Sequence, residues 1–440
     1  MGFSWCLAPA VATLIVSQNT SAGPDQQGEP VSAHTSRVDV GIVGGGPAGL
    51  MTALLLTRRG ISVAVVERRS QETIRATQRA GILEAPTVDM LVDAEIGSRV
   101  LTEGHEHEGT VLSFDGVQHR IDFQALVGRS VWLYPQNEVF HDLATAWQAE
   151  GGEIHWEVDD AAVEGLEGDA PAITFTDAAG EARRIEAELI VGADGSRSMC
   201  RKLIPDDVRT DYRTTYPFAW FGILCEAPPT APELIYANSE VGFALISQRN
   251  EDITRMYFQC DPDTDPEDWS DDAIFDHIQR VLGGEDVVAL KRGRIIDKTV
   301  LPFRSYVCDP LTHGRLVLAG DAGHTVPPTG AKGLNLAFSD VRALVPRIEE
   351  FLTGLRQGVE GAADVDPETV TEPLRRYSKT ALDRVWKAQN FSWWATNLLH
   401  RRPGEDPFAH QRRRGEFDAI TGSVHGQAYF ADSYTGWADA

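Results

Sequence analysis

The chain has 440 residues, 42% of them hydrophobic and 24% charged, the composition of an ordinary globular protein with about two or three domains. Its formal net charge of −25 argues against a general surface for nucleic acid or for anionic membranes. The five cysteines are scattered and form no CxxC pair. This pattern argues against a disulfide framework or a metal site and indicates a reducing, cytoplasmic compartment.

The first 36 residues precede the first recognisable strand. They contain an apolar run from Leu7 to Val16, but the first basic residue is Arg37, so the positive region of a signal peptide is missing. The run is also too short to span a bilayer. We therefore expect residues 1–36 to be a disordered or artefactual extension, and we expect no attachment to a membrane.

The next stretch has the pattern of a dinucleotide-binding βαβ unit. The predicted elements are a strand, a helix and a second strand over residues 38–43, 47–59 and 62–66. The turn after the first strand fits GxGxxG. Gly44 permits the sharp turn, Gly46 lets the backbone approach a pyrophosphate, and Gly49 lets helix and strand pack closely. Glu67, directly after the second strand, is placed to accept hydrogen bonds from a ribose.

An arginine cluster and three further elements follow. The cluster consists of Arg68, Arg69, Arg75 and Arg79. Such a cluster is usually a solvated face, but beside a dinucleotide site it can hold phosphate. The predicted elements are a hairpin over 110–123 with its turn at Asp115-Gly116, a helix over 138–149, and a buried strand from Leu189 that ends in Asp194-Gly195.

Residues 216–301 alternate like strands and predict a separate sheet domain. Ser247 and Arg249 are two residues apart and therefore share one face of a strand. The segment 254–259 is the predicted hairpin partner, which would bring Tyr257 to the same face. An arginine fork beside a hydroxyl suits a carboxylate, although Arg249 read alone is more typical of a surface salt bridge.

The segment from Gly314 to Asp340 predicts a second ligand-binding turn. It consists of a strand over 316–319, a Gly-Asp turn, a proline-rich stretch and a helix start at Gly333, Leu334 and Asn335. Backbone N–H groups at a helix start attract negatively charged or electron-rich groups. Asp321 is placed to accept hydrogen bonds from a sugar-like hydroxyl. Read alone, the run is also typical of a tight turn in any α/β protein.

Three motifs recur in a fixed order: GGGPAG, then ADG, then AGDAGH followed by PPTGAKGLNLA. With ELIYAN (233–238) and GFALISQR (242–249), they resemble the single-component flavoprotein aromatic hydroxylases, most strongly the group that acts on 4-hydroxybenzoate. The resemblance covers residues 37–430. It implies FAD as cofactor, NADPH or NADH as donor, O2 as co-substrate, and ring hydroxylation through a flavin C4a-hydroperoxide that yields 3,4-dihydroxybenzoate. It also implies a homodimer.

The same resemblance implies roles for individual residues. Those implied to hold FAD are Gly44, Gly46, Gly49, Glu67, Arg79, Gln136, Asp194, Gly195, Arg255, Asp321, Gly333, Leu334 and Asn335. Those implied to contact the nicotinamide donor are Arg68, Arg201 and Arg304. The substrate carboxylate would meet Ser247, Arg249 and Tyr257, and its phenol would meet Tyr236 and the backbone carbonyl of Pro328. Tyr236 would begin a proton relay that ends at His107, on the solvent side.

Two departures qualify these expectations. The family's second relay tyrosine is expected a few residues before a Gly-Ser, where this chain has Ile420. That change would leave room for a substituted 4-hydroxybenzoate, which is the nearest alternative substrate. Ser196-Arg197 after the Asp-Gly pair leaves the choice between NADPH and NADH open. An alternative of another class is a protein that binds flavin and an aromatic acid without turnover.

The predicted fold class is α/β: a Rossmann-like FAD-binding domain with an inserted β-sheet substrate domain and a helical C-terminal region. The predicted ranges are 37–106, 130–212 and 302–350 for the first, 107–129 and 213–301 for the second, 351–372 for a polar linker or insertion, and 373–440 for the third. An aromatic stripe in this last region, which includes Trp386 and Trp393, predicts core packing or a subunit interface.

Overall fold

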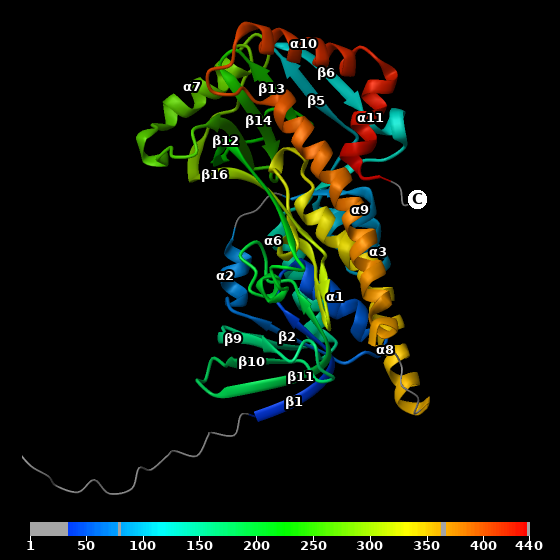
Figure 1. Ribbon diagram of the computed structural model, residues 1–440. Coiled ribbons are helices and arrows are strands. Elements are labelled where there is room, and N and C mark those ends of the chain that lie inside the picture. Colours follow the sequence, from blue (N-terminus) through cyan, green and yellow to red (C-terminus); the bar gives the residue numbers. More distant parts are fainter. Residues whose placement is uncertain (1–33, 78–80, 362–366, 438–440) are drawn as a thin grey trace, which may run out of the picture.

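The computed structural model describes residues 34–77, 81–361 and 367–437 (Figure 1). Most of the expected N-terminal extension, residues 1–33, lies outside these ranges, as does Arg79. The last three residues of that extension were assigned wrongly, because strand β1 begins at His34 and pairs from there with Arg183. No described helix is both long and apolar enough to cross a bilayer.

The first sheet is built around parallel strands, in the order β17-β18-β11-β1-β2-β8. Its central strands are β1 (His34–Val43), β2 (Val63–Glu67), β11 (Ala182–Gly192) and β18 (Leu316–Leu318). Val43 pairs with both Val66 and Gly192, and Gly192 pairs with Leu318. The carboxyl ends of the four strands are therefore level, and the loops that follow them meet at one edge of the sheet.

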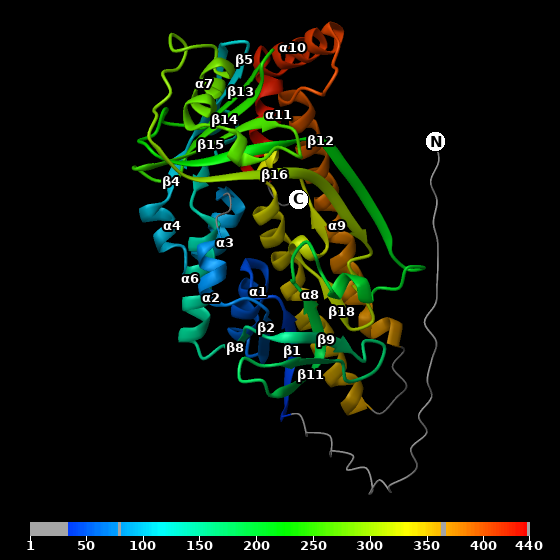
Figure 2. The ribbon, with the colours of Figure 1, turned by 90° about the vertical axis from the view of Figure 1, so that its left-hand side faces the viewer.

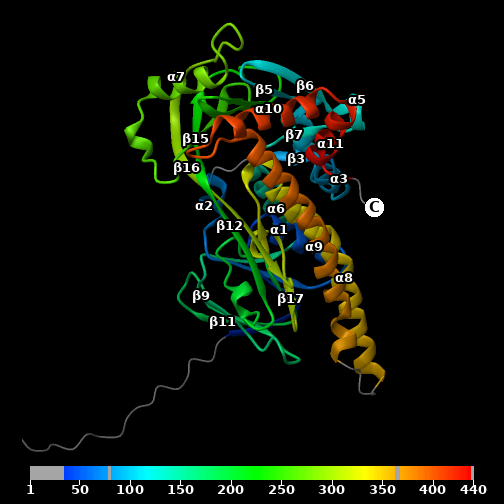
Figure 3. The same ribbon diagram turned by 45° about the horizontal axis from the view of Figure 1, so that its top comes forward.

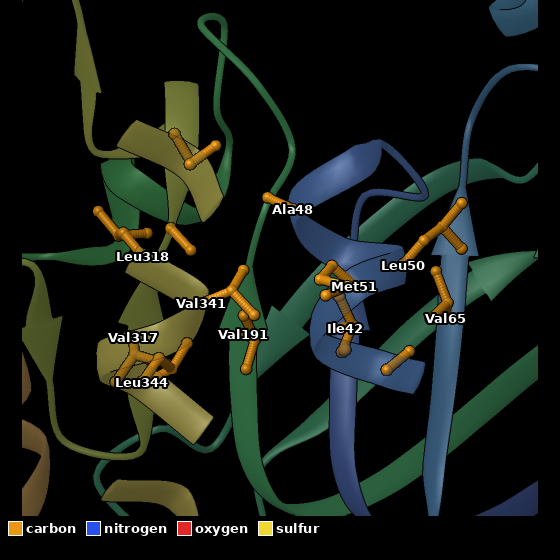
Figure 4. Close-up of a cluster of buried hydrophobic side chains, with 14 of the residues drawn as sticks. Ile42, Ala48, Leu50, Met51, Val65, Val191, Val317, Leu318, Val341 and Leu344 are labelled. Atoms are coloured by element: carbon orange, nitrogen blue, oxygen red, sulfur yellow. The ribbon is translucent and has the colours of Figure 1, made fainter. Parts of the chain in front are cut away.

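Buried apolar side chains along these strands explain why two helices pack side by side on the sheet. Helix α1 (Pro47–Thr57) starts with a proline in its first turn and is almost entirely apolar, so it packs on one face. Helix α8 (Gly333–Gly361) packs beside it, with Val341 and Leu344 buried against the sheet. Figure 4 shows Ile42, Val65 and Val191 from the strands meeting side chains from both helices.

The second sheet is largely antiparallel, in the order β19-β16-β12-β15-β14-β13-β5-β6. Strands β12 (Thr210–Glu226) and β16 (Arg294–Asp309) are long enough to run from this sheet into the first domain, as Figure 2 shows. Alternate side chains divide the sheet into two faces. One face packs on helix α7 (Asp271–Val281), and the other packs on the C-terminal helices.

Helix α9 (Pro367–Leu399) runs beside α8 and continues onto the second sheet, where α10 (Pro407–Thr421) and α11 (Val424–Thr435) complete the cover (Figures 1 and 3). The expected linker at 351–372 is therefore largely helical. Residues 351–361 complete α8, and α9 starts six residues before the predicted Pro373.

The remaining elements are short. The helices are α2 (Gln71–Ala76), α3 (Ala85–Asp93), α4 (Ser98–Glu103), α5 (Phe123–Val127) and α6 (Gln136–Ala149). The strands are β3 (Ile82–Glu84), β4 (His105–His107), β5 (Gly109–Phe114), β6 (Val117–Asp122), β7 (Val131–Leu133), β8 (Glu153–Trp156), β9 (Asp159–Glu164), β10 (Ala172–Thr176), β13 (Ile235–Ser239), β14 (Gly242–Gln248), β15 (Ile253–Cys260), β17 (Thr312–His313) and β19 (His324–Thr325).

A buried ion pair holds the turn after β18. His324 Nε2 and the backbone N–H of Gly320 both lie 2.7 Å from Asp340 Oδ2 on α8. Burial alone would lower the pKa of His324, but the charge and hydrogen bond of Asp340 outweigh it and raise that pKa. The imidazolium form therefore stabilises the folded state.

Replacing His324 by glutamine (H324Q) is expected to lower the free energy of unfolding by about 3 kcal/mol at pH 6. Because the folded-state pKa is raised, the pair contributes fully below the ordinary histidine pKa of about 6.5 and loses its contribution as pH rises through the folded-state value. The difference in free energy of unfolding between wild type and H324Q, measured by urea unfolding, should therefore become smaller at alkaline pH. H155Q removes an exposed pair with Glu153 and should cost less than about 1 kcal/mol.

In the turn after β1, one glycine is required for folding and another for ligand binding. A Cβ on Gly49 would lie 2.0 Å from the carbonyl oxygen of Gly44, whereas a Cβ on Gly46 would meet no atom within 4 Å. We expect G49A to destabilise the protein by about 3 kcal/mol or more. G46A should fold within about 1 kcal/mol of wild type but bind its dinucleotide at least about tenfold more weakly. Thermal unfolding and dinucleotide titration of the stripped protein measure the two effects. Equal losses in both variants would contradict this division.

Candidate active site

The carboxyl edge of the first sheet gathers the residues predicted to bind a dinucleotide. Gly44, Asp194 and Asp321 follow three of the four level strands, and Glu67 is the last residue of the fourth. Gly44 has φ +113°, a conformation that glycine adopts without strain, and an added Cβ there would strike the carbonyl of Ala193 at 2.2 Å. In open α/β sheets this edge is where ligands bind.

The carboxylate of Glu67 is fixed by short contacts within the βαβ unit. Its Oε2 accepts the N–H of Gly45 at 2.9 Å, and its Oε1 accepts the N–H of Arg69 at 2.9 Å. The Arg69 side chain adds an ion pair at 3.0 Å. Glu67 is buried, so these bonds set its orientation before a ribose could arrive. The sequence did not predict the pairing with Arg69.

Asp194 has a different environment from the one expected of a ligand-binding acid. Its carboxylate accepts hydrogen bonds from the Ser198 hydroxyl at 2.5 Å and from the backbone N–H groups of Met199 at 2.6 Å and Cys200 at 3.1 Å. It therefore binds backbone N–H groups at the start of the short 3-10 helix Cys200–Leu203. Gly195 beside it has φ +75° and open space at its Cβ position. The backbone of this turn is thus more accessible than its carboxylate.

The start of α8 lies next to a buried lysine. Leu336 N–H donates to the carbonyl of Lys332 at 2.8 Å, so the N–H groups of Gly333, Leu334 and Asn335 precede the first intrahelical bond. The Asn335 side chain accepts from Glu84 N–H and donates to the carbonyls of Ile82 and Ala331 at 2.8–2.9 Å. Its amide therefore fixes the position of the helix start.

Lys332 is 1% exposed and pairs with Glu84 Oε1 at 2.5 Å. Its ammonium also donates to the backbone carbonyl of Tyr434 at 3.2 Å and lies 5.2 Å from the ring centres of Phe391 and Trp437. Burial lowers the pKa of Lys332, and Glu84 opposes that shift. This cation was not singled out from the sequence. Its signal would have been a lone lysine within an otherwise apolar stretch.

One face of the second sheet aligns the candidate substrate residues. Tyr236 on β13 pairs with Leu245 on β14, and Leu245 pairs with Tyr257 on β15. Ser247, two residues further along β14, pairs with Arg255. Because paired residues of antiparallel strands point to the same side, all five side chains lie on one face, as the alternation predicted for Ser247 and Tyr257. This face packs on the C-terminal helices.

Arg249 supplies positive charge at one end of this face. Among the described residues, no carboxylate lies within ion-pair distance of its guanidinium. It donates instead to Asn137 Oδ1, at 2.9 Å. Burial and the neighbouring Arg255 lower the pKa of Arg249 to about 10, so it stays charged at neutral pH. Ser247, whose Oγ donates to the Gln248 carbonyl at 3.1 Å, lies two residues earlier, on β14. A half-buried cation without a counter-ion can bind an anion.

A pair of buried tyrosines lies at the other end of the face. The hydroxyls of Tyr236 and Tyr434 are 2.7 Å apart, and both residues are buried. Burial raises the pKa of both phenols, so both are neutral in the unliganded protein. Ile420, where a second relay tyrosine was expected, packs at the edge of the apolar cluster. The hydroxyl that meets Tyr236 is instead that of Tyr434, in the last turn of α11.

His107 differs from its expected position at the solvent end of a relay. It is 1% exposed, and burial lowers its pKa to about 4 against an opposing effect of Glu233, so the ring is neutral at pH 7. Its Nε2 lies 3.3 Å from Gln248 Nε2, and its buried Nδ1 has no partner in the described structure. Hydrogen bonds among the described residues link Tyr236 to Tyr434 but join neither of them to His107. The expectation of an exposed histidine was therefore wrong.

The remaining predicted residues lie outside the two clusters described above. The Pro328 carbonyl accepts the N–H of Ala331 at 2.9 Å within a 3-10 turn. Gln136 begins α6. Arg201 stacks on the Tyr306 ring at 4.3 Å and donates to the carbonyls of Ala322 and Ser196 at 2.8 and 3.1 Å, so much of its guanidinium is already engaged. The other two arginines predicted to meet a nicotinamide donor, Arg68 and Arg304, are exposed.

Comparisons with known proteins agree with this architecture. A sequence profile described as "FAD binding domain" matches residues 37–361. The p-hydroxybenzoate hydroxylase of Acinetobacter baylyi is 40% identical over 405 residues, which cover 92% of this chain and 96% of that protein. A probable NADH-specific resorcinol 4-hydroxylase of Rhodococcus jostii is 25% identical over 355 residues, which cover 74% of this chain and 61% of that protein.

Solved structures share the fold at lower identity. The p-nitrophenol 4-monooxygenase PnpA of Pseudomonas putida superposes with a TM-score of 0.74 at 20% identity, covering 92% of this chain and 100% of that one. PqsL of Pseudomonas aeruginosa superposes with a TM-score of 0.68 at 21% identity, covering 87% and 100%. At these identities the likeness concerns the fold. With a 40% identical relative spanning nearly the whole chain, the protein belongs to the class A FAD-dependent aromatic hydroxylases, which use NAD(P)H as co-substrate.

Proposed function

We propose that this enzyme hydroxylates 4-hydroxybenzoate to 3,4-dihydroxybenzoate with NAD(P)H and O2. The observation that carries the proposal is a single sheet face with an uncompensated cation at one end and a buried phenol pair at the other. Arg249 with Ser247 and Tyr257 suits a carboxylate, and Tyr236 with Tyr434 suits a phenol. The relative of 40% identity that covers most of the chain is a p-hydroxybenzoate hydroxylase, which supports this substrate.

The residues at the sheet edge fit an FAD molecule. Added Cβ atoms on Gly46 and Gly333 meet no atom within 4 Å, so the backbone of both turns is open to a bound group. We propose that Gly44, Gly46, Gly49 and Glu67 hold the adenosine half. We assign Arg79, Gln136, Gly195, Asp321, Arg255 and the α8 start (Gly333, Leu334 and Asn335) to the rest of the cofactor. Bound FAD accepts electrons from the donor and activates O2 for transfer of one oxygen atom to the ring.

The side chains of the sheet face then bind, orient and deprotonate the substrate. Arg249 and Ser247 hold the carboxylate, which fixes the phenol beside Tyr236. The phenolic proton passes to Tyr236 while Tyr236 passes its own proton to Tyr434 and Tyr434 releases its own, so neither tyrosine has to carry a charge whose burial is costly. Loss of that proton makes the ring carbon next to the phenol oxygen more nucleophilic. Buried apolar residues around the pair, including Trp220 and Leu234, exclude bulk water.

Beyond Tyr434, we propose that the proton continues towards His107, whose buried Nδ1 has no partner in the described structure and can meet a bridging water. For the donor we propose NADPH, with NADH as the alternative, and we assign its contacts to the exposed Arg68 and Arg304 and to Arg201. A substituted 4-hydroxybenzoate is the second candidate substrate, but the feature that favoured it, Ile420 in the relay, is replaced by Tyr434. A pure binding protein has no use for the buried phenol pair.

The direct test is NAD(P)H oxidation by the FAD-loaded enzyme with and without 4-hydroxybenzoate, combined with product analysis. We expect strong stimulation and formation of 3,4-dihydroxybenzoate. R249Q should lose about 100-fold or more in affinity for the acid, because the carboxylate then loses a paired, half-buried charge. Stimulation that yields mainly hydrogen peroxide would show that another aromatic acid is the substrate.

Y434F is expected to slow hydroxylation by about 100-fold at pH 7, because the phenolic proton then has no exit through Tyr236. The loss should shrink as pH approaches the ordinary phenol pKa of about 10, where the substrate ionises unaided. Product formation per turnover, followed between pH 7 and 9, measures this. Y429F is the matched control, since Tyr429 lies on the same helix and is 47% exposed. A pH-independent loss would contradict the relay.

We further propose a homodimer and a reducing, cytoplasmic location. Trp386 and Trp393 of α9 are 42% and 49% exposed and line a groove of about 310 Å³ with Tyr212 and Arg213 of β12. Exposed aromatic patches of this kind are typical of protein interfaces. Sedimentation should give the mass of two chains, and the double variant W386A/W393A should shift the balance towards monomers. A wild-type protein that sediments as a single chain would contradict the proposal.

The scattered cysteines that the structure describes are free thiols, which supports the proposed reducing location.

A further inference from the structure

The carboxylate-binding arginine is oriented from the other domain. Arg249 directly follows β14 of the second sheet, and its Nη2 donates to Asn137 Oδ1 at 2.9 Å. Asn137 lies in the first turn of α6, directly after Gln136, which we assign to the cofactor. Because guanidinium only donates hydrogen bonds, the Asn137 oxygen must be the acceptor. The contact therefore joins the substrate sheet to the cofactor domain through one defined bond.

The charges around this contact explain the choice of a neutral acceptor. Glu138, the next residue of α6, could neutralise Arg249, but it is engaged by Arg99 Nη2 at 3.0 Å. Arg99, which belongs to α4, also pairs at 2.6 Å with Asp142, a second carboxylate of α6. The only group that α6 presents to Arg249 within hydrogen-bond distance is thus an uncharged carbonyl oxygen. It fixes the direction of the guanidinium and leaves its charge uncompensated for a ligand.

We infer that Asn137 is a positioning residue that sets the acid specificity of the site: it orients Arg249 for a ligand carboxylate without neutralising it. The inference rests on the proposed function for the identity of that carboxylate. It gives α6 a second task beside its assigned contact with the cofactor. It also predicts that a carboxylate in place of the Asn137 amide would compete with the substrate for the same guanidinium.

The test compares a charged ligand with a neutral one of the same shape. Dissociation constants of 4-hydroxybenzoate and 4-hydroxybenzamide are measured by titrating the FAD-loaded enzyme and following the flavin absorption. N137A should weaken binding of the acid about tenfold, the effect of one hydrogen bond to a charged group, and change binding of the amide less than about twofold. N137D should weaken binding of the acid about 100-fold or more and leave the amide unaffected or slightly improved.

Two controls separate positioning from general damage. Q148A, in the last turns of the same helix, should bind both ligands like wild type. In an R249A background, N137A should have no further effect on the acid. Equal weakening of acid and amide by N137A, or an undiminished effect in the R249A background, would overturn the inference.

The ligand-free enzyme keeps the inference testable if the proposed substrate is wrong. Should wild type bind neither 4-hydroxybenzoate nor benzoate, the proposed function fails. The bond between Asn137 and Arg249 is then judged by thermal unfolding of the two single variants and the double variant. Melting-temperature shifts that are not additive would support the positioning role, and additive shifts would overturn it.

Discussion

The site is organised around one buried cation. Removing an ammonium from water costs several kcal/mol, which the protein recovers only where an opposite charge and further acceptors converge on it. At Lys332 these come from Glu84 at the end of β3 and from the Tyr434 carbonyl at the end of α11. The cation therefore joins the segment before α8 to two parts of the chain that are distant in sequence.

The consequences of that junction extend through the site. Glu84 accepts from Lys332 through its side chain and donates its backbone N–H to Asn335, which in turn fixes the α8 start. Tyr434 uses its carbonyl for Lys332 and its hydroxyl for Tyr236. The position of the helix start and the position of the phenol pair are thus set by the same ion pair. A substitution of Lys332 would therefore disturb the start of α8 and the phenol pair together.

Features that depend on local chain geometry were predictable from the sequence. The glycine turn, the acids after the strands and the shared face of Ser247 and Tyr257 follow from periodicity and from the special conformations of glycine. Such features need only a few neighbouring residues. The same reasoning placed the turn at Asp115-Gly116, where both residues have positive φ angles.

Features that depend on distant contacts were not predictable in the same way. Tyr236 and Tyr434 are 198 residues apart, and nothing in the spacing of α11 distinguishes Tyr434 from the exposed Tyr429. The relay was therefore assigned by motif to Ile420, which lies in a different helix. His107 looked exposed because its neighbours are polar, yet its side chain is buried and lies against Gln248 of the second sheet. The pairing of Asn137 with Arg249 crosses two domains and leaves no local signal.

The long ribbon of β12 and β16 carries a mechanical consequence. It belongs to both domains, so the substrate sheet cannot rotate against the first domain without bending it. Its register shifts between Thr215 and Ala219, where β12 contains Pro217 and β16 contains Pro302. Proline cannot donate to a strand ladder, so the ribbon lacks ladder hydrogen bonds at this level. A rotation of the substrate sheet against the first domain would bend the ribbon most easily there.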